Sequence, residues 1–255
     1  GIPTAVHESN AVPGLTTRML EGSVNTIMVG FEESRANYRH PDRVEVTGTP
    51  VRVDFLDQDK AAARRELGIP EGKPLVVSVW GSLGAWHMNE IMTDFILRAC
   101  AKPFFSLIHS AGKAGYSKMS AELESEKPDY AKLGMDVRAY IYDMPRVMAA
   151  ADLVLCRAGA STLAELTAMG KPAILVPSPN VTNNHQERNA RVLEAAGGAK
   201  VMLEQEFTAD SLLGLVSELL QHPGQLEEMS RNMLKLAVPD ATDRIAAEVL
   251  ELASK

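Results

Sequence analysis

Short apolar runs alternate with longer amphipathic segments along most of this chain, and this alternation limits the folds that it can adopt. The runs predict strands over residues 4–6, 26–29, 44–47, 75–79, 106–109, 137–140, 153–156, 173–176 and 199–202. The segments predict helices over residues 60–67, 88–100, 118–126, 146–150, 163–169, 186–196, 209–220, 224–234 and 242–252. Strands that are apolar throughout are typical of a parallel sheet with helices on both faces. The sequence therefore predicts an α/β fold with a doubly wound parallel sheet.

A break in this pattern near Thr49-Pro50-Val51-Arg52 divides the chain. Residues 1–50 hold too few elements for a closed domain, so we interpret them as the C-terminal part of an incomplete first domain. Residues 51–240 hold a full α/β series and are expected to form a whole second domain. Residues 241–255 form a last helix that we expect to pack back against the first domain. Because the chain opens at Gly1 without a Met and enters a strand almost at once, we expect that upstream sequence is missing.

The composition argues against several classes of protein. Hydrophobic residues make up 45% of the 255 residues and charged residues 23%, which is ordinary for a globular chain. A formal net charge of −7, without a basic cluster, argues against nucleic acid as a partner. The apolar runs are too short to span a bilayer, and no signal peptide is recognisable. Cys100 and Cys156 stand in apolar contexts without metal-binding spacing, and we predict that both are buried thiols.

The first candidate site is the turn Gly81-Ser82-Leu83-Gly84-Ala85, between a predicted strand and a predicted helix. Two glycines let a ligand approach the backbone, and the free amides at a helix start favour phosphate. The spacing matches neither a dinucleotide fingerprint nor a P-loop. Many such turns use glycine only to reverse the chain, so this turn leaves phosphate binding and a purely structural role equally open.

The second candidate site runs from Arg157 to Glu165 and again joins the end of a strand to the start of a helix. The Glu165 carboxylate could accept hydrogen bonds from the vicinal hydroxyls of a ribose. Thr162 and Glu165 also have the spacing of a capping box, in which each side chain satisfies a backbone amide at the helix start. One pose of the carboxylate cannot serve both roles, and the sequence leaves both open.

The third candidate site is the polar loop 177–190, which contains two prolines and four asparagines and follows another strand. Amide side chains such as Gln186 and Asn189 both donate and accept hydrogen bonds, which suits the hydroxyls of a sugar. Asn183 or Asn184 could instead cap the next helix, and we interpret His185 as a solvated residue at the helix start. The three loops follow strand ends that meet at one edge of the sheet, so we expect them to form one site.

Five motifs together resemble one family of enzymes. They are His7-Glu8-Ser9-Asn10-Ala11-Val12-Pro13-Gly14, Gly48-Thr49-Pro50-Val51-Arg52, Gly81-Ser82-Leu83-Gly84-Ala85, the segment from Arg157 to Glu165, and His185-Gln186-Glu187-Arg188-Asn189-Ala190. In this order, and over nearly the whole chain, they resemble the MurG-type bacterial glycosyltransferases of peptidoglycan synthesis. The resemblance implies a GT-B fold, in which two Rossmann-like domains face each other across a cleft. It also implies inverting transfer of N-acetylglucosamine from UDP-N-acetylglucosamine to lipid I, which gives lipid II.

The resemblance assigns roles in binding the donor nucleotide. Arg52 and Ser82 would contact the diphosphate, together with backbone amides of the turn formed by Gly81, Ser82, Leu83 and Gly84. The backbone near Ile141 would read the uracil edge, and Glu165 would hold the ribose hydroxyls. The remaining donor-binding positions of the second site would be Gly159, Ala160, Ser161 and Thr162.

The resemblance also assigns the sugar and the acceptor. Gln186 and Asn189 would face the N-acetylglucosamine ring, with His185 at the neighbouring position. Glu8 and Asn10 would lie on the acceptor side of the cleft. We expect a cytoplasmic protein that is peripheral on the inner face of the bacterial cell membrane, with no obligatory metal or cofactor.

The chain departs from the family pattern at two places. Trp80 stands where a glycine usually precedes Gly81, so the approach of the loop to phosphate depends on where the indole packs. The family's glycine-rich acceptor loop with its candidate base histidine, and its membrane-docking patch, have no counterpart here. We therefore expect a chain that binds the donor but turns over poorly, and we assign no catalytic base. Two alternatives stay open: a non-catalytic UDP-sugar-binding module, and another GT-B enzyme such as a UDP-N-acetylglucosamine 2-epimerase.

Overall fold

Two parallel sheets form the framework of the protein. The computed structural model describes residues 1–81 and 85–254. The smaller sheet has the order β1 (Ala5–Glu8), β2 (Thr26–Val29) and β3 (Val44–Val46). The larger sheet has the order β6 (Met135–Arg138), β5 (Ser106–Ser110), β4 (Leu75–Val79), β7 (Leu153–Cys156), β8 (Ala173–Leu175) and β9 (Ala199–Val201). All paired strands are parallel and each predicted strand has a counterpart, so the predicted α/β class is confirmed.

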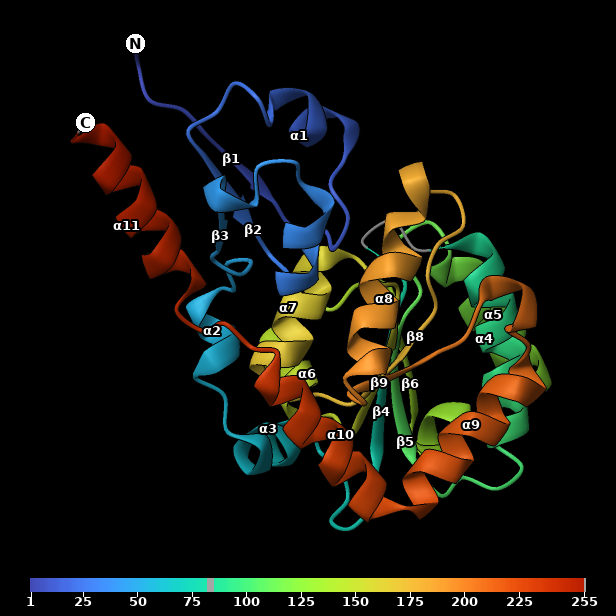
Figure 1. Ribbon diagram of the computed structural model, residues 1–255. Coiled ribbons are helices and arrows are strands. Elements are labelled where there is room, and N and C mark those ends of the chain that lie inside the picture. Colours follow the sequence, from blue (N-terminus) through green and yellow to red (C-terminus); the bar gives the residue numbers. More distant parts are fainter. Residues whose placement is uncertain (82–84, 255) are drawn as a thin grey trace.

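Helices cover both faces of the larger sheet (Figure 1). One face packs against α4 (Trp86–Ala99), α5 (Tyr116–Glu126) and α9 (Ala209–Gln221). The other packs against α3 (Lys60–Glu66), α6 (Met144–Ala150), α7 (Ala160–Ala168) and α8 (His185–Ala195), while α10 (Pro223–Lys235) contributes to both. Every predicted helix is present. The prediction missed α1 (Leu15–Leu20) and α2 (Val53–Leu56), which are too short to show a helical period. Short 3-10 segments lie at Glu32–Asn37, Pro41–Arg43, Tyr130–Leu133, Thr182–Asn184 and Glu204–Glu206.

The strand order of the larger sheet changes direction between β4 and β7. From β4 the chain builds β5 and β6 to one side, and it then returns to build β7, β8 and β9 on the other. In sheets of this kind a crevice opens outside the carboxyl ends of the two strands at the switch point, and ligands bind there. The turns that follow β4 and β7 therefore flank the expected ligand position.

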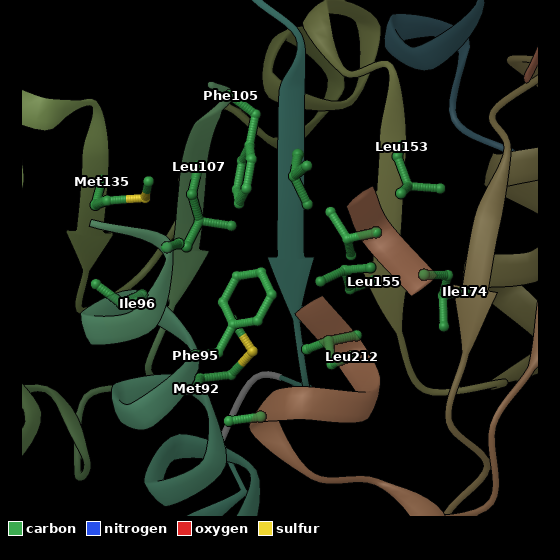
Figure 2. Close-up of a cluster of buried hydrophobic side chains, with 14 of the residues drawn as sticks. Met92, Phe95, Ile96, Phe105, Leu107, Met135, Leu153, Leu155, Ile174 and Leu212 are labelled. Carbon is green, nitrogen blue, oxygen red and sulfur yellow. The ribbon is translucent and has the colours of Figure 1, made fainter. Parts of the chain in front are cut away.

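Large apolar side chains between α4 and the sheet hold that helix in place (Figure 2). Met92, Phe95 and Ile96 recur at helical spacing on α4 and are fully buried. The ring of Phe95 lies with its centroid 6.0 Å from that of Phe105, just before β5. This packing fixes α4, and with it the end of the turn that follows β4.

The chain passes between the two sheets twice, after β3 and after α10, and the two connecting segments lie side by side. Gly48, in the first crossing, has a φ of 75°, and a Cβ at this position would come within 2.6 Å of the Val238 Cβ in the second. Only glycine fits there without strain. Beyond Val238, α11 (Ala241–Ala253) runs beside the smaller sheet (Figure 1), where Arg244 Nη1 donates to the Val46 carbonyl at 3.5 Å. The division into residues 1–50, 51–240 and 241–255 stays a prediction.

A side-chain cap begins α3. The Asp59 carboxylate accepts a hydrogen bond from the Ala62 amide at 2.7 Å, and this bond satisfies one of the free amides of the helix start. Asp59→Ala is expected to lower the free energy of unfolding by about 1 kcal/mol, measured by urea denaturation at neutral pH. Asp57→Ala is the matched control, because no hydrogen bond or ion pair joins the Asp57 side chain to another described residue. Equal losses in the two variants would contradict the capping role.

Candidate functional site

The start of α7 presents open backbone amides at the switch point. Gly159 is the N-cap residue, and no side chain caps the helix. The amides of Ala160, Ser161 and Thr162 make no hydrogen bond to a described residue, and they lie at the positive end of the helix dipole. The alternative prediction, a capping box formed by Thr162 and Glu165, is therefore wrong, because both residues lie inside the helix. The helix start stays available to a ligand that carries negative charge or accepts hydrogen bonds.

Gly81 follows β4, which pairs with β7 at the switch point. Gly81 has a φ of 100°, a backbone conformation that favours glycine. Ser82, Leu83 and Gly84 lie outside the described residues, so the phosphate contacts assigned to them stay a prediction. The next described residue, Ala85, is the N-cap of α4.

A carboxylate and a guanidinium lie near the start of α7. Glu165 is half-buried, and its carboxylate has no hydrogen-bond partner in the described parts of the chain. Burial raises the pKa of Glu165, the positive charge of Arg52 opposes that rise, and Asp54 adds to it. Arg52 is exposed, with its Nε atom 3.2 Å from an Asp54 carboxylate oxygen and its guanidinium 5.2 Å from the centroid of the Phe55 ring. Two of the predicted donor-binding residues are thus close enough to interact electrostatically.

Ile141 lies in the connection from β6 to α6, at the same edge of the sheet. Its side chain is 3% exposed and belongs to the core beneath α6, so only its backbone can face a ligand. The neighbouring rings of Tyr140 and Tyr142 are exposed, with their centroids 4.8 Å apart. This arrangement suits the predicted reading of a base edge by the backbone, which stays a prediction.

The polar loop before α8 is organised by its own side chains. Gln186 Oε1 accepts a hydrogen bond from the Ser178 amide at 2.9 Å, so this side chain spans the loop. His185 Nδ1 donates to the Thr182 carbonyl at 2.8 Å, so in the neutral ring Nε2 is the nitrogen that can accept a hydrogen bond. Asn184 occupies the N-cap position, as one alternative predicted, but its side chain donates to Glu187 instead of capping the backbone.

Asn189 joins the smaller sheet to the second candidate site. The side chain is fully buried, and its Oδ1 accepts a hydrogen bond from the Ala11 amide at 2.8 Å. Its Nδ2 donates to Asn10 Oδ1 at 3.0 Å and to the Ala158 carbonyl at 3.3 Å. Asn189 thus ties the segment after β1 to the turn before α7. A contact with a sugar ring, as predicted for Asn189, would require it to exchange these partners.

Glu8 organises the turn that carries Asn10. The carboxylate is buried and accepts hydrogen bonds from the amides of Asn10 and Gly14, at 3.1 and 2.8 Å. It also accepts from Asn10 Nδ2 and Thr17 Oγ1, both at 2.9 Å. Burial alone would raise the pKa of Glu8, but the four hydrogen bonds outweigh burial and lower it. Glu8 therefore shapes the turn from within, and its assignment to the acceptor side stays a prediction.

Trp80 packs into the core between the larger sheet and the helices α4, α5 and α9. Its indole is 3% exposed and meets the Phe207 ring edge to face, with the centroids 5.5 Å apart. The guanidinium of Arg157 lies 5.9 Å from the indole centroid and forms an ion pair with Glu204 at 2.6 Å. The sequence reasoning missed this cluster, because only the fold brings Phe207 and Glu204 to Trp80. Trp86, by contrast, is 61% exposed at the first position of α4.

The tripeptide Asp57-Gln58-Asp59 has the spacing of an Asp-x-Asp motif, which the sequence reasoning overlooked. Since the carboxylate of Asp59 caps α3, this tripeptide is part of a helix start and lies between α2 and α3.

Over residues 1–81 and 85–254, no helix combines the length and the apolar character that crossing a membrane would need.

Comparison with known sequences gives this site a context. The sequence profile of the glycosyltransferase family 28 C-terminal domain matches residues 75–245. The chain belongs to glycosyltransferase family 28. A curated relative from Acetivibrio thermocellus is 41% identical over 96% of this chain and 65% of its own length. Another, from Ruminiclostridium cellulolyticum, is 41% identical over 99% of this chain and 68% of its own length. Both are named UDP-N-acetylglucosamine–N-acetylmuramyl-(pentapeptide) pyrophosphoryl-undecaprenol N-acetylglucosamine transferase.

A solved structure agrees with the family. The crystal structure of MurG from Acinetobacter baumannii matches with a TM-score of 0.78 and 26% identity, over 98% of this chain and 67% of that one. The family 28 chain described here therefore has the Rossmann-like GT-B fold that the motifs predicted. It spans 65% of the length of the Acetivibrio relative, or about two thirds.

Proposed function

We propose that this chain binds UDP-N-acetylglucosamine at the carboxyl edge of the larger sheet, as part of an inverting transferase that passes the sugar to lipid I and so forms lipid II. The observation that carries the proposal is the uncapped start of α7, with the Arg52 guanidinium and the Glu165 carboxylate close by at the switch point. The carboxylate makes no hydrogen bond within residues 1–81 and 85–254. The names of the curated relatives support this donor and this acceptor. We further propose that the protein works at the inner face of the bacterial cell membrane.

Each part of the donor meets a group of suitable chemistry. The Glu165 carboxylate accepts hydrogen bonds from the ribose hydroxyls, and the backbone near Ile141 faces the uracil. Arg52 and the open amides of Ala160 and Ser161 attract the diphosphate. All of these groups stand in place before the ligand arrives, apart from the side-chain rotation that frees Arg52 from Asp54.

The same groups favour the transfer step. The acceptor hydroxyl attacks the anomeric carbon from the face opposite to UDP, so that the bond to the diphosphate oxygen breaks and the configuration inverts. Negative charge then grows on the departing UDP, where the fixed amides of α7 and the Arg52 guanidinium stabilise it. The acceptor hydroxyl loses its proton to a base, and we assign that role to no residue of this chain.

Donor binding is the decisive test. Calorimetric titration with UDP-N-acetylglucosamine is expected to saturate, and Glu165→Ala is expected to weaken binding by about tenfold or more, because hydrogen bonds to a charged group are lost. Glu126→Ala is the matched control, since this glutamate is exposed on α5 away from the switch point. Trp86 fluorescence gives a second readout, because Trp86 follows the turn at the proposed phosphate site.

Three outcomes separate the alternatives. No saturation by UDP-N-acetylglucosamine, or equal binding by Glu165→Ala and the control variant, would overturn the donor site. Binding with transfer to lipid I supports the full proposal. Binding with only slow transfer, in the presence of lipid I in membrane vesicles, is the result expected of this chain, because none of its residues is assigned as the base. Binding with no transfer above background would favour the non-catalytic module over the transferase.

A further inference from the structure

A cleft lies at the edge of the larger sheet that is opposite to the proposed donor site. Its volume is about 910 Å³, which is within the range of small-molecule sites. The residues just before β4, β7 and β8 line it, together with the end of α7 and the start of α10. The proposed donor site lies at the carboxyl ends of these strands, so the two sites are separated by the length of the sheet.

Positive charge dominates the lining of this cleft. The cationic side chains are Lys60, Arg64, Lys73, Lys171 and Arg231, against the two carboxylates of Asp152 and Glu227. Such an excess is unexpected on a chain with a net charge of −7. Asp152 is already engaged by Lys60 at 2.6 Å and by Arg64 at 2.9 Å. Arg231 has no ion-pair partner among the residues that the structure describes, and Lys73 Nζ bonds only to the Leu133 carbonyl, at 3.0 Å.

Lys171 is the most buried of these cations, with 7% of its surface exposed. Its ammonium donates to the carbonyls of Ala149 and Ala151, at 2.6 and 3.1 Å, where α6 ends. An ammonium has three donors, so one remains for a ligand. Burial lowers the pKa of Lys171 to about 7, and the positive charges of Lys60 and Arg64 add to this effect. A cap for α6 would explain Lys171 alone, but it would not explain why Arg231 lines the same cleft without an ion-pair partner among the described residues.

The remaining wall of the cleft is apolar. Phe55, Leu56, Met169, Leu220 and Leu226 line it beside the cations. Small-molecule sites commonly combine an apolar lining with a few converging polar groups. A phosphate monoester carries up to two negative charges at neutral pH and three acceptor oxygens, which matches several cations better than a single carboxylate would.

We propose that this cleft is a second ligand site, which binds a small phosphate monoester with an apolar or aromatic substituent. The phosphate lies between Lys171 and Arg231, and the substituent packs against Met169 and Leu226. The cleft meets the end of α7, whose start faces the proposed donor site, so one helix connects the two sites. The inference does not depend on the proposed function.

Phenyl phosphate is a suitable probe, titrated by calorimetry in the presence of saturating UDP so that the donor edge is already filled. Saturable binding is expected, and Arg231→Gln is expected to weaken it by about tenfold, since it removes a charge-assisted contact. Arg231 is exposed and unpaired among the described residues, so its replacement leaves the fold intact. Lys171→Met is expected to abolish binding, and circular dichroism checks that this variant folds.

Two controls make the test specific. Lys102→Met removes one positive charge from an exposed position away from the cleft, and it is expected to leave the affinity for phenyl phosphate unchanged. Phenol, which lacks the phosphate, is expected not to bind. Absence of saturation by phenyl phosphate, or equal affinities in Arg231→Gln and Lys102→Met, would overturn the proposal. The proposed donor site is tested separately, because Glu165→Ala is expected to bind phenyl phosphate normally.

Discussion

Between pH 6.5 and pH 4.5 the protein is expected to lose about 1.4 kcal/mol of stability per pH unit through a single buried histidine, His109. His109 lies in β5 beneath α4 and is fully buried. Its Nδ1 lies 3.1 Å from Ser78 Oγ, and its Nε2 has no hydrogen-bond partner in the part of the chain that the structure describes. Because a charged imidazole would be stranded in this core, burial lowers the pKa of His109 to about 3.

The direction of the effect follows from proton binding in the two states. In the unfolded chain the imidazole takes up a proton below about pH 6.5, whereas in the folded chain it stays neutral down to about pH 3. Acid therefore stabilises the unfolded state relative to the folded state over this window, and the stability that neutral His109 contributes is lost as the pH falls. The stability that the ionised Glu8 carboxylate contributes is lost only at lower pH, because the pKa of Glu8 in the folded chain lies below its ordinary value.

His109→Gln separates this effect from all other titrations. The free energy of unfolding is measured by urea denaturation from pH 7 to pH 4.5 for the wild type and for the variant. The variant is expected to be less stable than the wild type at pH 7. The difference between their free energies of unfolding should shrink by about 1.4 kcal/mol for each pH unit below 6.5. His87→Gln, at an exposed position on α4, is expected to keep the wild-type slope. A deficit that stays constant over the window would contradict the assignment.

The sequence predicted the elements of the fold well because their signals are local. The strands over Leu75–Val79 and Leu153–Cys156 appear with the predicted bounds, since a buried parallel strand is apolar at nearly every position. Helix α7 begins three residues earlier than predicted, at Ala160, because its first turn carries small residues, Ala160, Ser161 and Thr162, instead of the large apolar residues of a helical period. That early start overturned the capping-box alternative for Glu165.

The contacts within the candidate site depended on the fold. Sequence reasoning placed Asn189 against a ligand because an amide in a polar loop suits a sugar. The structure gives it partners in a segment about 180 positions earlier in the chain, at Asn10 and Ala11. The approach of Phe207 and Arg157 to Trp80 is likewise a product of long-range packing. His109 and Lys171 gave no signal in the sequence, because their properties come from burial and from neighbours that are distant in the chain.

Removing the Glu8 carboxylate is expected to cost about 3 kcal/mol or more of stability. Glu8→Ala would leave the amides of Asn10 and Gly14 and the hydroxyl of Thr17 without their acceptor, in a largely buried turn. Glu8→Gln keeps one acceptor oxygen and should cost about half as much. Glu45→Ala is the control, because Glu45 is exposed on β3, and it should change the free energy of unfolding by less than about 0.5 kcal/mol. Urea denaturation at pH 7 gives all three values.

The same variants test whether the Glu8 turn supports Asn189. Glu8 positions Asn10, and Asn10 Oδ1 accepts a hydrogen bond from Asn189. If the Glu8 turn and the hydrogen bonds of Asn189 stabilise each other, the losses of unfolding free energy in Glu8→Gln and Asn189→Ala should not add. A double-mutant cycle should then give a coupling free energy of about 0.5 kcal/mol or more. Simple additivity would mean that Glu8 stabilises only its own turn. A measurable coupling would mean that the segment after β1 and the start of α7 are held as one unit, because Asn189 also bonds to the Ala158 carbonyl just before that helix.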